Sequence, residues 1–428
     1  MRIRWCMAAA IFAAMPTCLF AQAKTSDWPE WRGPLRDGIS KATGLMQSWP
    51  EKGPKLVWTA ADVNGKVNVG RGYASIVIAD AKIFTLGDRD NKGHVICLDE
   101  ATGKILWKTP FTEPYGDGGP RCTPTVSGNR IYGLSAHGDL VCCDTQSGKI
   151  VWQKNLKKDF AGRMMSGWNY SESPLVDGDR VICTPGGKEA ILVALDKESG
   201  SVIWNTQSPQ ASGAGYASPI VSQGGGVKQY LTMMGPELGL VSVDAATGKF
   251  LWNYKKVANG TANIPTPIVA GDYVFASTAY GTGSVLLHLK KSDSGVKAEE
   301  VYFLKANTLQ NHHGGMVMLG DYIYGGHNHN AGFPFCLEWK TGKMAWGPVQ
   351  PPGGGSAAVL YADGQLYFRY DDNTMALIEA TPKEYKLNGT FPLPKGTSRP
   401  GWQHPVIHNK KLYIRANDQL YCFDIAKQ

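Results

Sequence analysis

The stretch LVCCDTQSGKIVW, residues 140–152, places two adjacent cysteines before an acidic residue, a glycine and a tryptophan. The same order recurs along the chain, with glycine four residues after the acid and tryptophan eight residues after it. Five copies end at Trp107, Trp152, Trp204, Trp252 and Trp346. Recurrence at a regular interval indicates a fold built from copies of one small unit.

The intervals between the copies set the size of this unit. The acids Asp99, Asp144, Asp196 and Asp244 are 45, 52 and 48 residues apart, and Glu338 follows after 94 residues, which fits two repeats. Two degenerate copies, KKSDSGVKAEEVY and IEATPKEY, bring the number to seven. A repeat of nearly 50 residues is long enough for four short strands and their turns.

Each motif predicts a hairpin. Its acid can accept hydrogen bonds from backbone N–H groups of the turn, and its glycine can adopt the left-handed conformation that closes the turn. Two further short strands precede the motif, as in residues 124–133, 174–183, 267–276 and 316–325. We therefore expect four-stranded antiparallel sheets, each with a tryptophan on its outer strand that packs against the next sheet.

The two ends of the chain predict how the ring of sheets closes. The final repeat stops at Gln428, before a fourth strand, whereas PKLVW at residues 54–58 is a strand without a motif before it. We predict that Lys55–Trp58 completes the last sheet and removes its exposed edge. The fold class is then all-β, an eight-bladed propeller over residues 55–428 with a lead-in segment at 24–54.

The repeat also explains the paired cysteines. Cys142 occupies the position two residues before the motif acid, and Cys143 occupies the next position. The position of Cys142 holds small residues in the other copies, namely Cys97, Ala194, Ser242, Cys336 and Cys422. We interpret both cysteines as buried structural side chains, in preference to a redox device.

Residues 1–23 have the features of a cleaved secretory signal. Arg2 and Arg4 precede an apolar stretch, and Ala21–Ala23 forms a small-x-small cleavage site. We therefore expect a periplasmic or secreted protein, with no later membrane span. Removal of the signal lowers the formal charge from +8 to +6, and the basic residues stand singly, so we expect no nucleic-acid partner. We also expect a monomer.

The acid-x-x-Thr/Ser-Gly-x-x-x-Trp repeat resembles the tryptophan-docking motif of the pyrroloquinoline quinone (PQQ) repeat propellers. SDWPEWRGPLRDGIS, residues 26–40, resembles the lead-in of quinoprotein alcohol dehydrogenases. The resemblance implies either such an enzyme or a scaffold like the propeller lipoprotein of the outer-membrane β-barrel assembly machinery. The docking tryptophans that it implies are Trp58, Trp107, Trp152, Trp204, Trp252 and Trp346.

The dehydrogenases of this family use PQQ, a Ca²⁺ held by Glu and Asn, a vicinal disulfide and a general-base Asp. The segment after Trp252, NYKKVANGTANIPTPIV, contains no carboxylate, and Cys142-Cys143 lies in a predicted strand. Only Glu172 with Asn263 could imitate the calcium ligands. No catalytic residue is assigned, and we expect PQQ and Ca²⁺ only if the chain is a divergent dehydrogenase.

The segments that enter the innermost strands should line one mouth of the channel, and they are rich in glycine, aromatic and polar residues. The predicted ligand-binding residues are Arg71, Tyr73, Arg121, Asn169, Tyr170, Glu172, Tyr216, Asn263, His312, His313, Trp402 and His404. Aromatic walls with a few polar groups are typical of ligand sites, although the same side chains could plug the channel. The two arginines suit an anion.

Four histidines, His312, His313, His327 and His329, lie within 18 residues, but their spacing matches no known metal motif, so we predict no metal site. The sequence thus favours a binding or scaffold protein, with either a protein partner in the cell envelope or a small anionic ligand. The alternative is a divergent PQQ- and calcium-dependent alcohol dehydrogenase.

Overall fold

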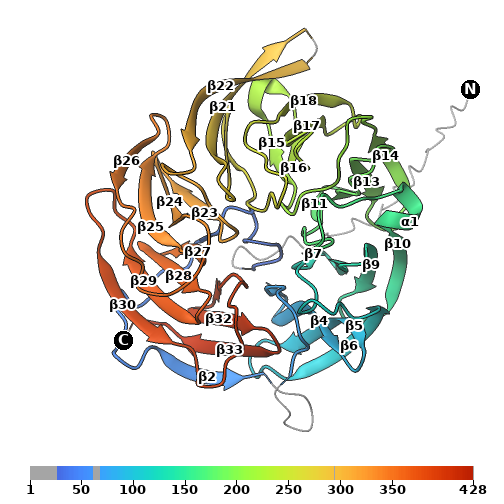
Figure 1. Ribbon diagram of the computed structural model, residues 1–428. Helices are drawn as coiled ribbons and strands as arrows, with labels where there is room; N and C mark the ends of the chain where they lie inside the picture. Colours follow the sequence, from blue (N-terminus) through green and yellow to red (C-terminus); the bar gives the residue numbers. More distant parts are fainter. Residues whose placement is uncertain (1–26, 61–67, 294, 428) are drawn as a thin grey trace, which may run out of the picture.

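Eight antiparallel sheets follow one another around a ring in a computed structural model of the chain (Figure 1). The structure describes residues 27–60, 68–293 and 295–427. The predicted signal sequence, residues 1–23, lies outside them. The eight-bladed propeller expected from the repeat is therefore confirmed.

The strands run in chain order, from the innermost to the outermost strand of each blade. Blades 1 and 2 contain β3 (Val77–Ala79), β4 (Lys82–Arg89), β5 (Lys92–Asp99) and β6 (Ile105–Thr112), then β7 (Thr125–Ser127), β8 (Arg130–Leu134), β9 (Asp139–Asp144) and β10 (Ile150–Asn155). Blades 3 and 4 contain β11 (Leu175–Asp177), β12 (Arg180–Cys183), β13 (Leu192–Asp196) and β14 (Val202–Thr206), then β15 (Ile220–Ser222), β16 (Gln229–Met233), β17 (Leu240–Asp244) and β18 (Phe250–Tyr254). Two short helices, α1 (Leu156–Phe160) and η1 (Gly224–Gly226), interrupt them.

The second half of the ring repeats this order, with one addition. Blades 5 and 6 contain β19 (Ile268–Ala270), β20 (Tyr273–Thr278), β21 (Gly283–Ser292) and β22 (Gly295–Lys305), then β23 (Met316–Leu319), β24 (Tyr322–His327), β25 (Phe333–Glu338) and β26 (Lys343–Trp346). Blade 7 contains β27 (Ala357–Ala362), β28 (Gln365–Tyr370), β29 (Thr374–Glu379) and β30 (Leu387–Pro392). A short N-terminal strand, β1 (Ile39–Ser40), pairs in parallel with β27 on the inner edge of this blade.

Blade 8 closes the ring as predicted. It contains β31 (Val406–His408), β32 (Lys411–Ala416) and β33 (Gln419–Asp424), and β2 (Lys55–Thr59) from the N-terminal part pairs antiparallel with β33. The first and last parts of the chain thus share one sheet, and β2 covers the edge of β33 that would otherwise be exposed.

The motif turn is built as the sequence indicates. Asp144 Oδ1 accepts hydrogen bonds from the backbone N of Ser147 at 2.8 Å and from its Oγ at 2.7 Å. Gly148 has a φ of 70°, and a Cβ placed on it would lie 2.6 Å from the indole of Trp107 in the preceding blade. Glycine is therefore required both for the turn and for the approach of the tryptophan.

The strand register explains why Cys142 and its equivalents are small. Each docking tryptophan stands directly opposite this position on the neighbouring strand, so a larger side chain there would compete with the indole for space. The pairs are Trp58–Cys422, Trp107–Cys97, Trp152–Cys142, Trp204–Ala194, Trp252–Ser242 and Trp346–Cys336. Cys142 and Cys143 are buried and unpaired, and burial raises the pKa of both thiols to about 12. Neither is poised for redox chemistry.

The degenerate fifth repeat replaces the tryptophan by Tyr302. Its hydroxyl donates to the carbonyl of Trp339 in blade 6, and a Cβ on Gly342 would lie 3.1 Å from its ring. Tyrosine therefore performs the same docking on the next motif glycine. The described residues include no helix with the length and hydropathy of a membrane span.

We expect replacement of a docking tryptophan to weaken the contact between two blades. Trp204 is 9% exposed and packs on Gly248 of the next blade, so Trp204→Ala should lower the free energy of unfolding by about 3 kcal/mol. Ile203, the adjacent residue in the same strand, is 41% exposed, and Ile203→Ala should cost less than about 1 kcal/mol. Chemical denaturation of both variants measures the difference, and equal losses would contradict the docking role.

Candidate functional site

An N-terminal strap, residues 28–40, crosses the centre of the ring (Figure 1). Arg36 anchors it, because its guanidinium donates to the carbonyls of Ser173 and Pro219 at 3.1 Å each. The Arg36 Nε also donates to Glu30 at 2.8 Å. The strap packs against the ring, and its residues line separate hollows on its two sides.

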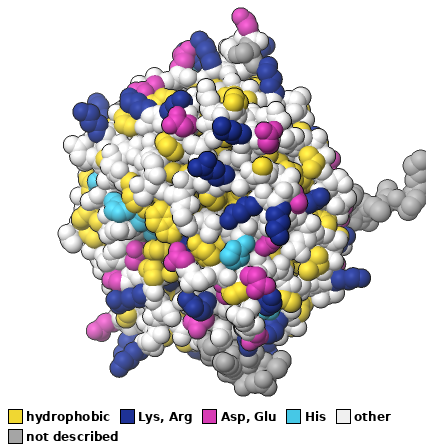
Figure 2. Space-filling model, turned by 45° about the vertical axis from the view of Figure 1, so that its right-hand side comes forward, with side chains coloured by type: hydrophobic (Ala, Val, Ile, Leu, Met, Phe, Trp, Pro, Cys, Tyr) yellow, Lys and Arg dark blue, Asp and Glu magenta, His cyan; other side chains and the backbone are white. Residues whose placement is uncertain are grey.

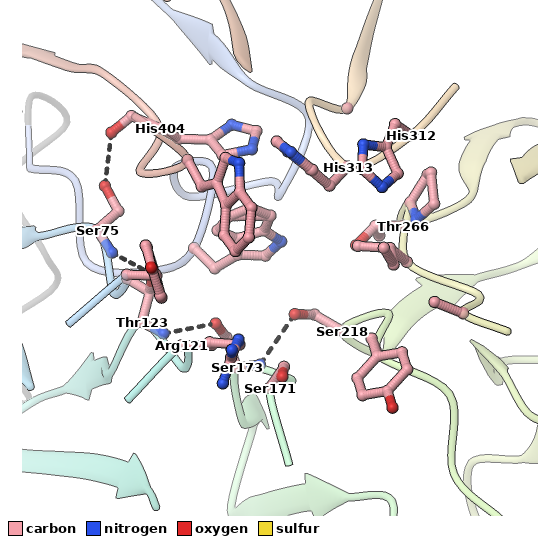
Figure 3. Close-up of a pocket in the computed structure, with 18 of the residues that line it drawn as sticks. Ser75, Arg121, Thr123, Ser171, Ser173, Ser218, Thr266, His312, His313 and His404 are labelled. Atoms are coloured by element: carbon pink, nitrogen blue, oxygen red, sulfur yellow. Dashed lines mark hydrogen bonds between the residues drawn. The ribbon is translucent and has the colours of Figure 1, made fainter. Parts of the chain in front are cut away.

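A cavity of about 350 Å³ opens on one side of this strap (Figure 3). Its wall comes from the segments that enter the innermost strands, as predicted, and its floor includes Trp31 and Arg32 of the strap. The predicted residues that line it are Tyr73, Arg121, Tyr216, His312, His313, Trp402 and His404. The structure thus brings seven of the twelve predicted residues together.

Aromatic rings pack against one another around the cavity. Trp31 meets His404 edge-on with ring centroids 4.4 Å apart, and Trp402 lies 4.7 Å from Tyr73 and 5.3 Å from His313. These contacts leave flat aromatic surfaces along the wall, which suit a ligand that contains a ring.

Three of the cavity histidines are uncharged at neutral pH. Burial, aided by neighbouring imidazoles, lowers the pKa of His312 to about 2 and that of His313 to about 3. Burial and the nearby Arg32 lower the pKa of His404 to about 3. A neutral imidazole offers one donor and one acceptor, so these rings can bind polar groups without adding charge.

The charges of the wall are positive. It contains Arg32 and Arg121 but no carboxylate among its described residues. Burial lowers the pKa of Arg32 to about 10, which leaves it protonated. Arg121 pairs with Asp117 at 2.8 Å, but that carboxylate is 61% exposed and therefore compensates the charge only weakly. The cavity should attract anions.

Five predicted residues do not line the cavity, and the expectation that they face it is corrected. Arg71 is exposed, and Asn169 accepts a hydrogen bond from Lys157. Tyr170 is buried and donates to the carbonyl of Pro185 at 2.8 Å.

The other two residues of this group are Glu172 and Asn263. Glu172 Oε1 accepts from the backbone N of Thr184 at 2.6 Å, and Asn263 donates to the carbonyl of Met234 at 2.8 Å. Side chains alternate in direction along an extended segment, and Ser171 and Ser173 occupy the cavity side on either side of Glu172. Glu172 therefore points between the blades.

Several cavity residues were missed in the sequence. Trp31, Arg32, Trp168, Tyr280, His329 and Asn330 come from the strap and from loops, and Ser75, Thr123, Ser171, Ser173, Ser218 and Thr266 come from the strand entrances. A Ser/Thr-Pro dipeptide before four innermost strands was a usable signal for four members of this second group, Thr123, Ser173, Ser218 and Thr266. The strap residues carried no signal, because nothing in the sequence shows that residues 28–40 enter the channel.

The residues present do not fit a calcium site. Ca²⁺ takes oxygen ligands, usually including carboxylates, and the wall offers none. Glu172 and Asn263 hydrogen-bond to separate backbone groups away from the cavity. His327 lies outside the cavity wall, and the described residues contain no group of three or more His, Cys, Asp or Glu side chains that could hold a metal ion.

Both the sequence and the fold of the chain are similar to those of known proteins. The family of outer membrane protein assembly factor BamB matches residues 91–348, more than half of the chain. The chain belongs to the BamB family. No curated protein matches it in sequence.

Solved structures show the same fold in BamB proteins and in quinoproteins. BamB from Moraxella catarrhalis is 14% identical with a TM-score of 0.58, and the match covers 84% of this chain and 98% of that one. Quinohemoprotein alcohol dehydrogenase from Comamonas testosteroni is 14% identical with a TM-score of 0.62, covering 95% and 81%. A europium-containing methanol dehydrogenase is 11% identical with a TM-score of 0.63, covering 94% and 98%. At these identities the similarity shows the fold alone.

Glu172 should make the stability of this BamB-family propeller depend on pH. Burial raises its pKa from 4.5 to about 7, so the folded state favours the protonated carboxyl. Its contribution to stability is complete below about pH 4.5 and is lost as pH rises through about 7. Glu172→Gln, which mimics the protonated form, should unfold with a free energy about 3 kcal/mol higher at pH 8 and unchanged at pH 4.

Denaturant titrations of both proteins at these two pH values measure this difference. Other buried carboxyls titrate equally in the two proteins, so the comparison isolates Glu172. An equal pH dependence in the variant would contradict the assignment.

Proposed function

We propose that this propeller is an exported binding protein of the cell envelope that takes a small anionic ligand in the mouth cavity. The observation that carries the proposal is a wall with two arginines, aromatic surfaces and no carboxylate among the described residues. The buried Arg32 donates to the backbone carbonyls of Asp37 and Met316, and an anionic ligand would offset part of the cost of burying its charge. On the face shown in Figure 2, Lys and Arg are interspersed with Asp and Glu, so this face has no comparable concentration of positive charge.

A second candidate is a scaffold for assembly of outer-membrane proteins. Membership of the BamB family supports it, because that family is described by such a role. Cross-linking in cells, followed by identification of partners among the β-barrel assembly proteins, would test this candidate. The dehydrogenase alternative has less support, since the wall supplies neither a carboxylate base nor calcium ligands.

PQQ is a suitable first probe because it is a planar anion. We expect titration of the mature protein to show binding that quenches the fluorescence of cavity tryptophans such as Trp31 and Trp402 and does not change when Ca²⁺ is added. An alcohol-dependent dye-reduction assay on the same sample should show no turnover. Calcium-dependent binding with turnover would instead establish the dehydrogenase.

Trp31→Ala provides the matched test of the cavity. It removes part of the floor, so we expect PQQ affinity to fall roughly tenfold. Trp49 belongs to the same N-terminal segment but packs against Phe391, outside the cavity wall, and Trp49→Phe should keep the affinity. Equal affinities in all three proteins would place the ligand elsewhere.

A further inference from the structure

Ser or Thr hydroxyls occupy equivalent positions in four neighbouring blades, and three of them are linked by hydrogen bonds between the blades. Thr123, Ser173 and Ser218 each stand two residues before the innermost strand of blades 2, 3 and 4, and a proline follows each of them. Their residues are only 2%, 2% and 4% exposed, and all three line the mouth cavity. The shared position makes their side chains point the same way, toward the axis of the ring.

Hydrogen bonds between the blades fix each hydroxyl oxygen as an acceptor. The backbone N of Ser75 donates to Thr123 Oγ1 at 2.9 Å, that of Thr123 donates to Ser173 Oγ at 3.1 Å, and that of Ser173 donates to Ser218 Oγ at 2.9 Å. A hydroxyl has one proton to donate, and no described group of the protein accepts these three protons. Ser75 differs, because its Oγ donates to the carbonyl of His404 at 2.7 Å.

Each of these hydroxyls can therefore donate its proton to a group inside the cavity, and three such donors lie along one side of it. Figure 3 shows Thr123, Ser173 and Ser218 on one side of the cavity, facing the histidines on the other side. Beneath them, Arg36 donates to the carbonyls of Ser173, Pro174 and Pro219, so a guanidinium charge lies under the same peptides. Because Glu30 pairs with Arg36 at 2.8 Å, that charge is compensated, and the hydroxyl row would act through its O–H donors.

We propose that Thr123, Ser173 and Ser218 form an oxyanion subsite that receives the carboxylate, sulfate or phosphate group of a ring-bearing ligand. This inference rests on the proposed function, since it assumes that the mouth cavity binds a ligand. The aromatic ring of the ligand lies over the aromatic surfaces of Trp31, Trp402 and Tyr73. Its oxyanion accepts one hydrogen bond from each of the three hydroxyls. Charge-assisted hydrogen bonds of this kind are stronger than neutral ones.

Calorimetry with benzoate, benzenesulfonate, phenyl phosphate and neutral benzamide tests the subsite on the mature protein. We expect at least one of the three anions to bind, and the preferred one identifies the oxyanion. Benzamide should bind at least tenfold more weakly. Three variants, Thr123→Val, Ser173→Ala and Ser218→Ala, each remove one donor to a charged group. Each should lower the affinity for the anion roughly tenfold. Thr123→Ser keeps the hydroxyl and should keep the affinity.

Thr125→Val is the matched control for lost stability. Thr125 Oγ1 donates to the carbonyl of Pro174 at 2.6 Å, an inter-blade bond outside the cavity wall, so this variant should melt earlier but bind the anion normally. If the anions bind and the three hydroxyl variants bind them equally well, the subsite is wrong and the proposed function stands. If benzamide binds as tightly as the anions, the subsite is also wrong. If no probe binds at millimolar concentration, both proposals fall.

Discussion

The indole that packs on the motif glycine of the next blade holds this propeller together. Each blade is a single sheet of four or five strands and could not bury its own apolar faces. The contact requires a glycine with positive φ, as at Gly148 and Gly248, and a small residue opposite the tryptophan, as at Cys142. The packing between blades therefore requires both the glycine turn and the small residue opposite the tryptophan. For this reason the whole motif recurs in the sequence.

The closed ring creates a channel, and the strap decides what that channel becomes. Arg36 donates to backbone carbonyls of the segments that lead into the inner strands, so the strap is fixed by hydrogen bonds as well as by apolar contact. Its Trp31 then forms part of the cavity floor. Because the strap precedes the first blade, the proposed ligand site depends on a segment that takes no part in the repeat.

The same inter-blade geometry that stabilises the ring also prepares the proposed oxyanion subsite. A backbone N–H from one blade uses the lone pair of a hydroxyl in the next, which orients that hydroxyl and leaves its proton free for the cavity. At Ser173 the same hydroxyl therefore links two blades and would donate to the proposed ligand. The described residues of the wall include no carboxylate and so do not fit a calcium site, although the fold is shared with quinoprotein dehydrogenases.

The sequence by itself determined the blades, their number and the closure by Lys55–Trp58, because spacing, turn chemistry and strand pairing are local or periodic properties. It also placed seven cavity residues, since entrances to the inner strands must meet at the axis. Only the tertiary structure decided that Glu172 and Tyr170 turn away between blades, because strand alternation needs a fixed register. It also decided that Trp31 enters the channel, since no periodicity connects the strap to the ring.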